Sequence, residues 1–224
     1  ARARRTERLP VVLEPAAAVN ARTYQDETAL MWAAAEGHTA VIEALLQAKA
    51  DPNRKARITT ISERKHADHP TGGFTALMYA ARNGHEPAVK ALVAGGADPR
   101  LTNGDGATAM MIAIVNDRFD LARTLLDLGA DANDGSLYFA VDMHDATTDM
   151  RARDGSRLRA DHANRLTALD LIGVLLDRGA DPNKAFIGQL HSTTLCCGEE
   201  VNASPFFRAA IAADVAALEL MIAP

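Results

Sequence analysis

The side chains best suited to chemistry lie in three polar segments of the 224-residue sequence. His66 and His69 lie in the first segment, His162 in the second, and His191, Cys196 and Cys197 in the third. Imidazole and thiolate groups bind zinc, and a cysteine beside a histidine can act as a nucleophile. Adjacent cysteines rarely bind the same tetrahedral ion, however, and none of these spacings matches a common zinc motif. We therefore expect no metal, no cofactor and no catalytic residue, and keep a metal or small-molecule site formed by these inserted loops as the alternative.

Other candidate motifs have simpler interpretations. The run Gly104-Asp105-Gly106 imitates part of a dinucleotide-binding fingerprint, but it does not follow a buried strand. The sequence contains no Gly-x-Ser-x-Gly motif, no phosphate-binding loop and no His-Glu-x-x-His motif. The basic cluster between 151 and 159 is interleaved with aspartates, so it creates little net field. The motifs therefore predict that the protein is not an enzyme.

The composition favours closely packed helices. Alanine makes up about a fifth of the chain, and only 4% of the residues are aromatic. The net charge of −5 argues against a nucleic-acid partner, and the absence of a long apolar run argues against a membrane partner. The two adjacent cysteines exclude an ordinary disulfide framework and favour a reducing compartment, with export after removal of a signal peptide left open. Abundant alanine and arginine favour a bacterial source.

Two short phrases recur along the chain in a constant phase. The first phrase ends at Asn20, Asn53, Arg100, Asn133 and Asn183, at intervals of 33, 47, 33 and 50 residues. The second begins at Thr28, Thr75 and Thr108, with a divergent copy at Ser204. A repeat of this length is typical of a stacked array, in which each unit buries its apolar faces against its neighbours.

Each repeat has the pattern of two short helices. The threonine of the second phrase precedes an apolar run, where its hydroxyl can accept a hydrogen bond from a free helical N–H. Gly37 and Gly84 separate two apolar stripes at helical spacing. Gly95, Gly129 and Gly179 follow the second stripe, where a left-handed residue commonly ends a helix. The sequence therefore predicts a helix, a turn, a second helix and a hairpin loop in each unit.

The segment 28–53 resembles the ankyrin repeat family in its Thr-Ala-Leu-Met-Trp-Ala-Ala start, its Gly-His turn, its Leu-Leu pair and its Ala-Asp-Pro-Asn end. Ala replaces the family's Pro after the Thr, and Met replaces its His. The resemblance implies an all-α fold, an ankyrin-repeat solenoid of about four full units, in one domain over 1–224. The implied units are a partial repeat at 1–20 and repeats at about 24–53, 71–100, 104–133, 134–183 and 200–224. It also implies that His38 and His85 bond backbone groups of neighbouring units.

Three insertions interrupt the period, at about 54–74, 142–165 and 184–203. The first and the third lengthen hairpin loops, so we expect them beside the concave face. The second separates the paired helices of the fourth unit and should emerge at the opposite ends of these helices. Long loops in compact folds are usually functional or disordered. We therefore expect the first and third insertions near a binding groove.

Both ends have the pattern of incomplete repeats. The segment 8–13 resembles the second helix of an earlier unit, and the last repeat stops at 218–222, before any Gly-Ala-Asp sequence. Repeat arrays normally need polar capping units at their ends. We therefore expect a fragment of a longer array, or self-association through uncapped ends.

The family resemblance implies a non-catalytic scaffold that binds another protein or a peptide through a concave groove of first-helix residues and hairpin loops. The contact positions carried over from the family are Tyr24, Gln25, Glu27, Glu36, Phe74, Arg82, Asn83, Asp105, Asn116 and Asp142. Trp32, Tyr79 and Tyr138 lie on first helices, where each either faces the groove or packs between repeats. We add Trp32 and Tyr79 to the predicted contacts because aromatic and Arg side chains are typical of interface hot spots.

Overall fold

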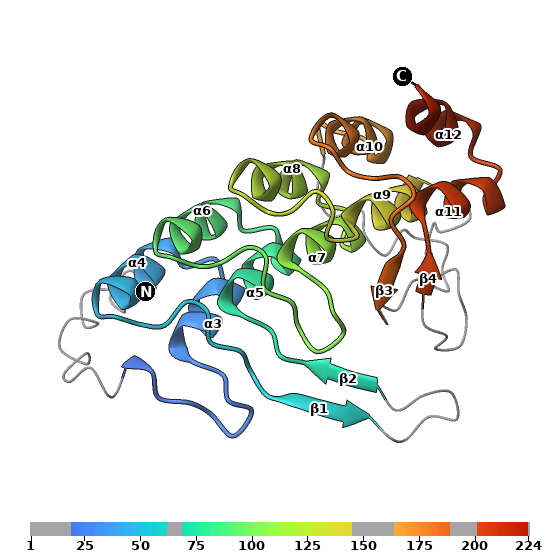
Figure 1. Cartoon of the computed structure of the whole chain (residues 1–224). Coiled ribbons are helices and arrows are strands. Elements are labelled where there is room, and N and C mark those ends of the chain that lie inside the picture. The colour runs from blue at the N-terminus through green and yellow to red at the C-terminus, as the bar shows by residue number, and fades with distance from the viewer. Residues whose placement is uncertain (1–18, 62–68, 145–163, 189–200, 224) are drawn as a thin grey trace, which may run out of the picture.

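Paired helices stack in two parallel rows in the computed structural model, which describes residues 19–61, 69–144, 164–188 and 201–223 (Figure 1). The inner row holds α3 (Ala29–Ala35), α5 (Ala76–Asn83), α7 (Ala109–Val115), α9 (Ser136–His144) and α11 (Pro205–Ile211). The outer row holds α4 (Thr39–Gln47), α6 (Glu86–Ala94), α8 (Phe119–Asp127), α10 (Ala168–Asp177) and α12 (Val215–Ile222). Each helix packs on its pair partner and on the next helix of its own row. This arrangement confirms the predicted all-α solenoid.

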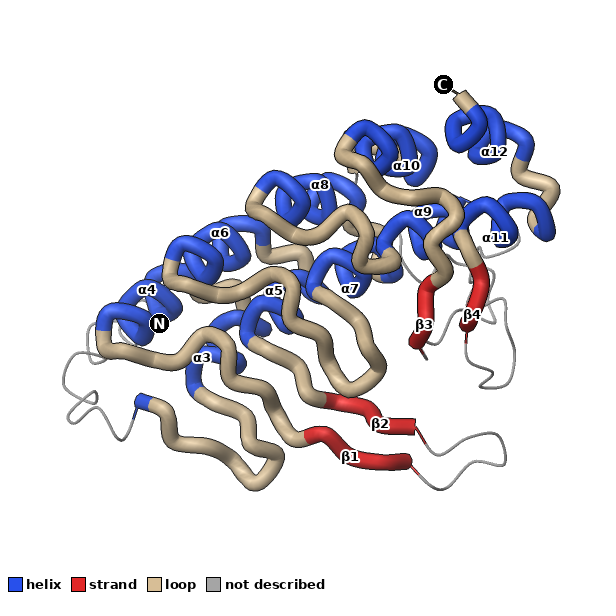
Figure 2. The backbone as a smooth tube through the Cα atoms, in the orientation of Figure 1, coloured by secondary structure: helices blue, strands red, loops and turns tan. Residues whose placement is uncertain are grey.

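Two antiparallel hairpins project from the inner row, away from the outer helices (Figure 2). The first pairs β1 (Ile58–Ile61) with β2 (His69–Gly72), and the second pairs β3 (Phe186–Gly188) with β4 (Val201–Ala203). Both lie within segments predicted to be lengthened hairpin loops. Among the described residues, no helix is both long and apolar enough to cross a membrane.

The predicted threonine caps begin the first three inner helices. The Oγ1 atoms of Thr28, Thr75 and Thr108 each accept a hydrogen bond from the amide three residues on, at 3.3, 3.4 and 3.2 Å. Met31 and Met78 complete the first two caps, because each sulfur accepts the N–H of the capping threonine at 3.4 Å. The thioether is a weak acceptor. It nevertheless takes up an N–H that would otherwise be buried without a partner.

Small side chains allow the inner helices to approach closely. Alanine recurs at one inner-helix position of every described repeat, and it is fully or nearly fully buried each time: Ala33, Ala80, Ala113, Ala140 and Ala209. The outer helices contribute larger buried side chains, among them Leu45, Leu92, Leu125 and Leu175. Truncating one such leucine to alanine typically costs about 2–5 kcal/mol. The core is therefore a continuous seam between the two rows.

The recurring asparagine links a unit to the next one wherever the bonds below are formed. Asn53 accepts the N–H of Asp98 at 2.8 Å through Oδ1 and donates through Nδ2 to the carbonyl of Gly96 at 2.9 Å. Asn133 repeats this pair of bonds with Asp181 and Gly179, at 2.7 and 2.8 Å. The asparagine of the first phrase is thus a structural residue. Its bonds to the next unit explain why it recurs at a fixed place in the repeat.

The glycines after the outer helices correct one prediction. Gly129 and Gly179 have φ of +99° and +86°, as the sequence predicts, whereas φ of Gly95 lies outside the left-handed region and Gly96 has φ of +93°. Gly95 serves another purpose, because a Cβ there would lie only 2.4 Å from Cδ1 of Leu46. The first of the two glycines permits close packing between units, and the second provides the turn.

Candidate interaction surface

An arginine lies against two aromatic rings at the hairpin side of α5. Phe74 comes just before the helix, while Tyr79 and Arg82 are three residues apart on it and therefore share a face. The ring centroids of Phe74 and Tyr79 are 5.3 Å apart, and the guanidinium carbon of Arg82 lies 5.5 and 5.2 Å from them. An exposed cation–π contact of this kind contributes about 0.5–1 kcal/mol. The two rings thus hold the exposed arginine in one orientation.

Tyr79 also joins this cluster to the preceding repeat. Its hydroxyl donates a hydrogen bond to Oε1 of Glu27 at 3.1 Å. Burial raises the pKa of Tyr79, the bond to Glu27 and its charge raise it further, and the charge of Arg82 opposes this shift. Tyr79 is consequently a neutral donor near neutral pH, and Glu27 is held in place by it.

Two further aromatic side chains are open to solvent in the same region. Trp32 has 55% of its surface exposed, and Tyr24, in the loop before α3, has 79%. Trp32 occupies the position on α3 that Tyr79 occupies on α5, since each comes just before the recurring alanine. We call the set Tyr24, Glu27, Trp32, Phe74, Tyr79 and Arg82 the open face. It contains six of the twelve predicted contact residues.

Several of the other predicted contacts have bonds within the chain. Nδ2 of Asn83 donates to the carbonyl of Ala35 at 2.7 Å, so Asn83 ties α5 to α3. Nδ2 of Asn116 donates to the carbonyl of Ile112 within its own helix, at 2.7 Å. Asp105 accepts from Nδ2 of Asn103 within a turn, at 2.9 Å. Gln25 and Glu36 are exposed at the surface.

His85 has the structural role that the family resemblance implies. Its Nε2 lies 3.1 Å from the carbonyl oxygen of Ala35, at the end of α3. In the third unit, Arg118 donates to the carbonyl of Arg82 at 3.1 Å. In the fourth unit, Asn164 donates to the carbonyl of Asp117 at 2.6 Å. The second, third and fourth units therefore each bond a carbonyl at or just after the end of the inner helix before it. The corresponding neighbour of His38 would fall in residues 1–18, outside the described residues.

The prediction that Asp142 contacts a partner is wrong, because Asp142 is buried. Its side chain is 5% exposed and accepts a hydrogen bond at 2.7 Å from Arg208, whose side chain is 7% exposed. A second pair lies nearby, with Nδ1 of His144 2.6 Å from Oδ2 of Asp214. These bonds join α9 to α11 and α12. The signal in the sequence was Arg208 itself, a charged residue at a position where the other inner helices have Trp32, Tyr79 or another uncharged residue.

Sequence analysis also missed the covering of α9 by β3. The ring of Phe186 lies 4.9 Å from Phe139 and 6.4 Å from Tyr138, measured between centroids. Phe139 and Tyr138 are almost completely buried, so Tyr138 belongs to the packing between elements. A side chain at Gly135 would collide with Phe186, because its Cβ would lie 2.4 Å from Cδ2 of that ring. We call Tyr138, Phe139 and Phe186 the covered face.

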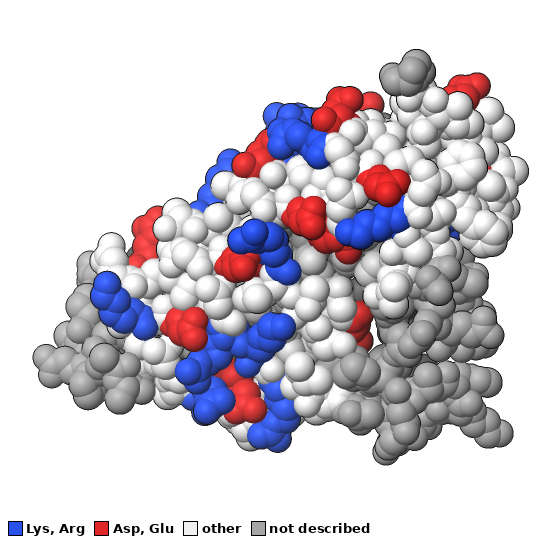
Figure 3. All heavy atoms as spheres, in the orientation of Figure 1, with Lys and Arg blue, Asp and Glu red and all other residues white. Residues whose placement is uncertain are grey.

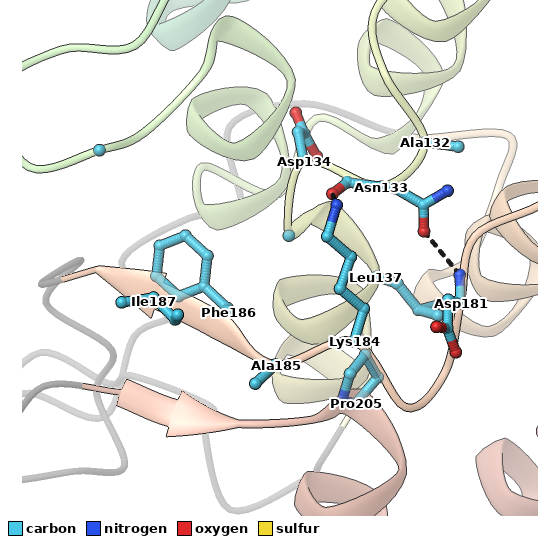
Figure 4. A pocket seen from close by; sticks show the side chains of 12 residues that line it. Ala132, Asn133, Asp134, Leu137, Asp181, Lys184, Ala185, Phe186, Ile187 and Pro205 are labelled. Carbon is cyan, nitrogen blue, oxygen red and sulfur yellow. Dashed lines mark hydrogen bonds between the residues drawn. The ribbon is translucent and has the colours of Figure 1, made fainter.

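A hollow of about 260 Å³ lies between the hairpin loop at 132–135 and the one that begins at 184, and Phe186 lines part of it (Figure 4). Nζ of Lys184 donates to the carbonyl of Asn133 at 2.7 Å. Asp134 accepts the hydroxyl of Thr108 at 2.5 Å and the N–H of Ser136 at 2.8 Å. Burial raises the pKa of Asp134, and these hydrogen bonds oppose the shift. The charged groups of Lys184 and Asp134 therefore already form hydrogen bonds within the hairpin loops.

The metal alternative concerns residues that lie mostly outside the described ranges. His66, His162, His191, Cys196 and Cys197 fall in undescribed segments, and His69 lies in β2. Over the described parts of the chain, no three His, Cys, Asp or Glu side chains are grouped as a metal ion would require.

Charges of both signs are interspersed on the face seen in Figure 3, with Lys and Arg densest near the loops before α3 and β1.

The comparisons with known proteins agree with the repeat architecture. A family model described as an ankyrin repeat matches residues 25–57, and one described as ankyrin repeats in three copies matches residues 59–136. No curated protein matches the chain. Ankyrin repeats are generally protein–protein interaction modules, and the family is typically not enzymatic. The phase of the two phrases, the stacked helix pairs and these matches together show that the chain belongs to the ankyrin repeat family.

Proposed function

We propose that the chain is a non-catalytic scaffold that binds a protein or peptide partner through the open face of its first two repeats. The observation that carries this proposal is Arg82 over the rings of Phe74 and Tyr79, on a helix that packs against α3, which bears the exposed Trp32. Aromatic and arginine side chains dominate the binding energy of protein interfaces. A rigid surface of this kind loses little conformational entropy when a partner binds.

The hydrogen bonds around the open face support its pre-organisation. Tyr79 is bonded to Glu27, and the backbone N–H of Arg57 donates to the carbonyl of Gln25 at 2.8 Å. These bonds cross between the first two repeats, so the side chains keep their relative positions before any partner arrives. The inner face at α9 is different, because Phe186 already occupies it.

The test is capture of proteins from a lysate of the source organism with three forms of the chain. The first is wild type, and the second carries Trp32→Ala and Arg82→Glu. The third is a matched control with Phe207→Ala and Arg165→Glu, which removes an exposed aromatic side chain and reverses an arginine charge elsewhere. Phe207 is 55% exposed, like Trp32, and the side chain of Arg165 is 89% exposed. Circular dichroism and thermal melts check that all three forms fold.

We expect a protein that is retained by wild type and by the control but lost from the open-face variant. Equal retention by all three folded forms would contradict the proposal. A partner lost from the control alone would move the contact surface to the last two repeats.

The last repeat offers a second candidate function, self-association. The side chains of Phe207, Ile211, Val215 and Ile222 are each more than half exposed on α11 and α12. Apolar patches of this kind often mark contacts with another chain. Light scattering over a range of protein concentrations tests this, since a mass that stays monomeric at every concentration would reject it. The variant Ile211→Asp with Val215→Asp should return any dimer to monomer.

A further inference from the structure

The fourth repeat contains an internal example of how an extended segment sits on the inner face. In β3, Phe186 points onto α9 and is buried, while the next residue, Ile187, is 75% exposed. This alternation is that of a strand with one face against a protein surface. The rings that Phe186 covers, Tyr138 and Phe139, come just before the recurring alanine of α9. The inner face of a repeat therefore accepts an aromatic side chain from an extended chain.

The first repeat lacks its own covering residue. Ala56 stands three residues after Asn53, as Phe186 stands three residues after Asn183. The two also share their backbone pairing, because the N–H of Ala56 donates to the carbonyl of Phe74 at 2.9 Å and Phe186 pairs with Ala203. The methyl group of Ala56 is too short to cover Trp32 as the ring of Phe186 covers Phe139. Trp32 is consequently 55% exposed, whereas Phe139 is fully buried.

The charges of the loops before α3 and β1 favour a carboxylate. Among the described ion pairs, two arginines share one aspartate here, with Arg22 and Arg57 each 3.3 Å from Asp26. The guanidinium of Arg82 contacts two rings and, among the described residues, makes no ion pair with a carboxylate. An arginine held over aromatic rings can still bind a carboxylate in a bidentate manner through its N–H groups.

We infer that the partner segment is an extended peptide that places an aromatic side chain against Trp32, over Ala56, and a carboxylate on the guanidinium of Arg82. This inference rests on the proposed function and adds the chemistry of the partner. Packed helices lie about 8–10 Å apart. Residues two positions apart in a strand lie about 7 Å apart on one face, so one short segment can reach α3 and α5 together.

The experiment selects displayed random peptides of about 12 residues on the immobilised wild-type chain. Enriched peptides are then synthesised with a fluorophore, and their affinities are measured by anisotropy. We expect an aromatic residue and an Asp or Glu two positions apart. Because Trp32 is the sole tryptophan of the chain, its emission should shift to shorter wavelength when such a peptide binds.

Variants of the chain make the assignment specific. Arg82→Glu should weaken binding about tenfold or more, since it replaces an attraction with a repulsion. Ala56→Phe should weaken binding similarly by covering Trp32 from within, and should itself shift the tryptophan emission of the free chain. Trp32→Ala removes the same aromatic contact without adding volume, in case Ala56→Phe fails to fold. Arg165→Glu, which reverses the charge of an arginine in another repeat, should leave binding unchanged.

The outcomes separate this inference from the proposed function. Enriched peptides that lack the aromatic and acidic pair, but are lost on Trp32→Ala or Arg82→Glu, would overturn the inference and leave the proposed function standing. Peptides bound equally by all variants would overturn both. If no peptide is enriched the inference falls, and the lysate capture then decides the proposed function with folded partners.

Discussion

The two projecting hairpins are built alike but cover different helices. In the first, Ala56 faces Phe74, and the phenylalanine leans on Tyr79 of the following helix. In the second, Phe186 pairs with Ala203, and the phenylalanine packs on Phe139 of the preceding inner helix, α9. The alanine and the phenylalanine have thus exchanged sides of the hairpin. This exchange leaves Trp32 open at one end of the molecule and closes the inner face at the other, so the binding surface depends on side chains placed on a common fold.

The same contrast appears where inner helices meet. The inner helices of the first repeats meet through Ala80 and its equivalents, whereas α9 and α11 are also joined by the buried pair of Asp142 and Arg208. A buried ion pair is costly to break but contributes little beyond what apolar packing would provide. The last repeat should therefore be sensitive to single substitutions and tolerant of paired ones.

The largest effect should come from Arg208→Ile, which places at this position the residue type that the third repeat has at Ile112. It removes the guanidinium that is bonded to the buried carboxylate of Asp142, so the free energy of unfolding should fall by about 3–5 kcal/mol. Urea denaturation followed by circular dichroism measures the change. Adding Asp142→Val, after Val115 of the third repeat, should recover most of the loss. A double variant as unstable as Arg208→Ile alone would contradict this, since the ion pair would then stabilise the fold beyond the mutual neutralisation of its two buried charges.

The next largest effect should come from Phe186→Ala, which uncovers α9. Removing a buried phenyl ring costs about 3 kcal/mol, because packing is lost and a cavity opens beside Phe139. Ile187→Ala is the matched control, since Ile187 is 75% exposed and should change stability by less than about 0.5 kcal/mol. The emission of Trp32 should be unaffected by either substitution. Equal losses for both residues would contradict the covered face.

Local patterns predicted the elements well, and contacts between distant residues were harder to predict. Thr28 and Thr75 cap helices as expected because a cap depends on residues three positions apart. The burial of Asp142 depends on Arg208, which is 66 residues further along. The covering role of Phe186 depends on which side of a strand faces the helices, and one residue of register reverses it. Four residues of the open face came from the contact positions of the family resemblance, and Trp32 and Tyr79 were added for their aromatic character. That these residues contact a partner stays a prediction.

A smaller effect concerns Asp134, which stands where the second repeat has Phe74 and the first has Glu27. Burial raises its pKa, so the folded state binds a proton more tightly than the unfolded state does. The free energy of unfolding should therefore fall as the pH rises from the ordinary value of an aspartate through the raised value. Asp134→Asn should remove this dependence and stabilise the chain near neutral pH by up to about 1 kcal/mol. Denaturation of both forms across the acidic range measures it, and parallel pH profiles would contradict the assignment.

The smallest effect should come from the end of the first outer helix. Lys49 has φ of +69° at the position where the later repeats have Gly96, Gly129 and Gly179. A side chain is strained in this left-handed region, whereas glycine is not. Lys49→Gly should therefore raise the free energy of unfolding by about 0.5 kcal/mol, after the greater freedom of glycine in the unfolded chain is subtracted. The reverse change, Gly96→Lys, should lower it by about 1 kcal/mol, because no atom lies within 4 Å of the added Cβ and only the backbone strain remains. If both substitutions destabilised the chain, Lys49 would contribute more through its contacts than it costs in strain, and the first repeat would differ from the others in more than its open face.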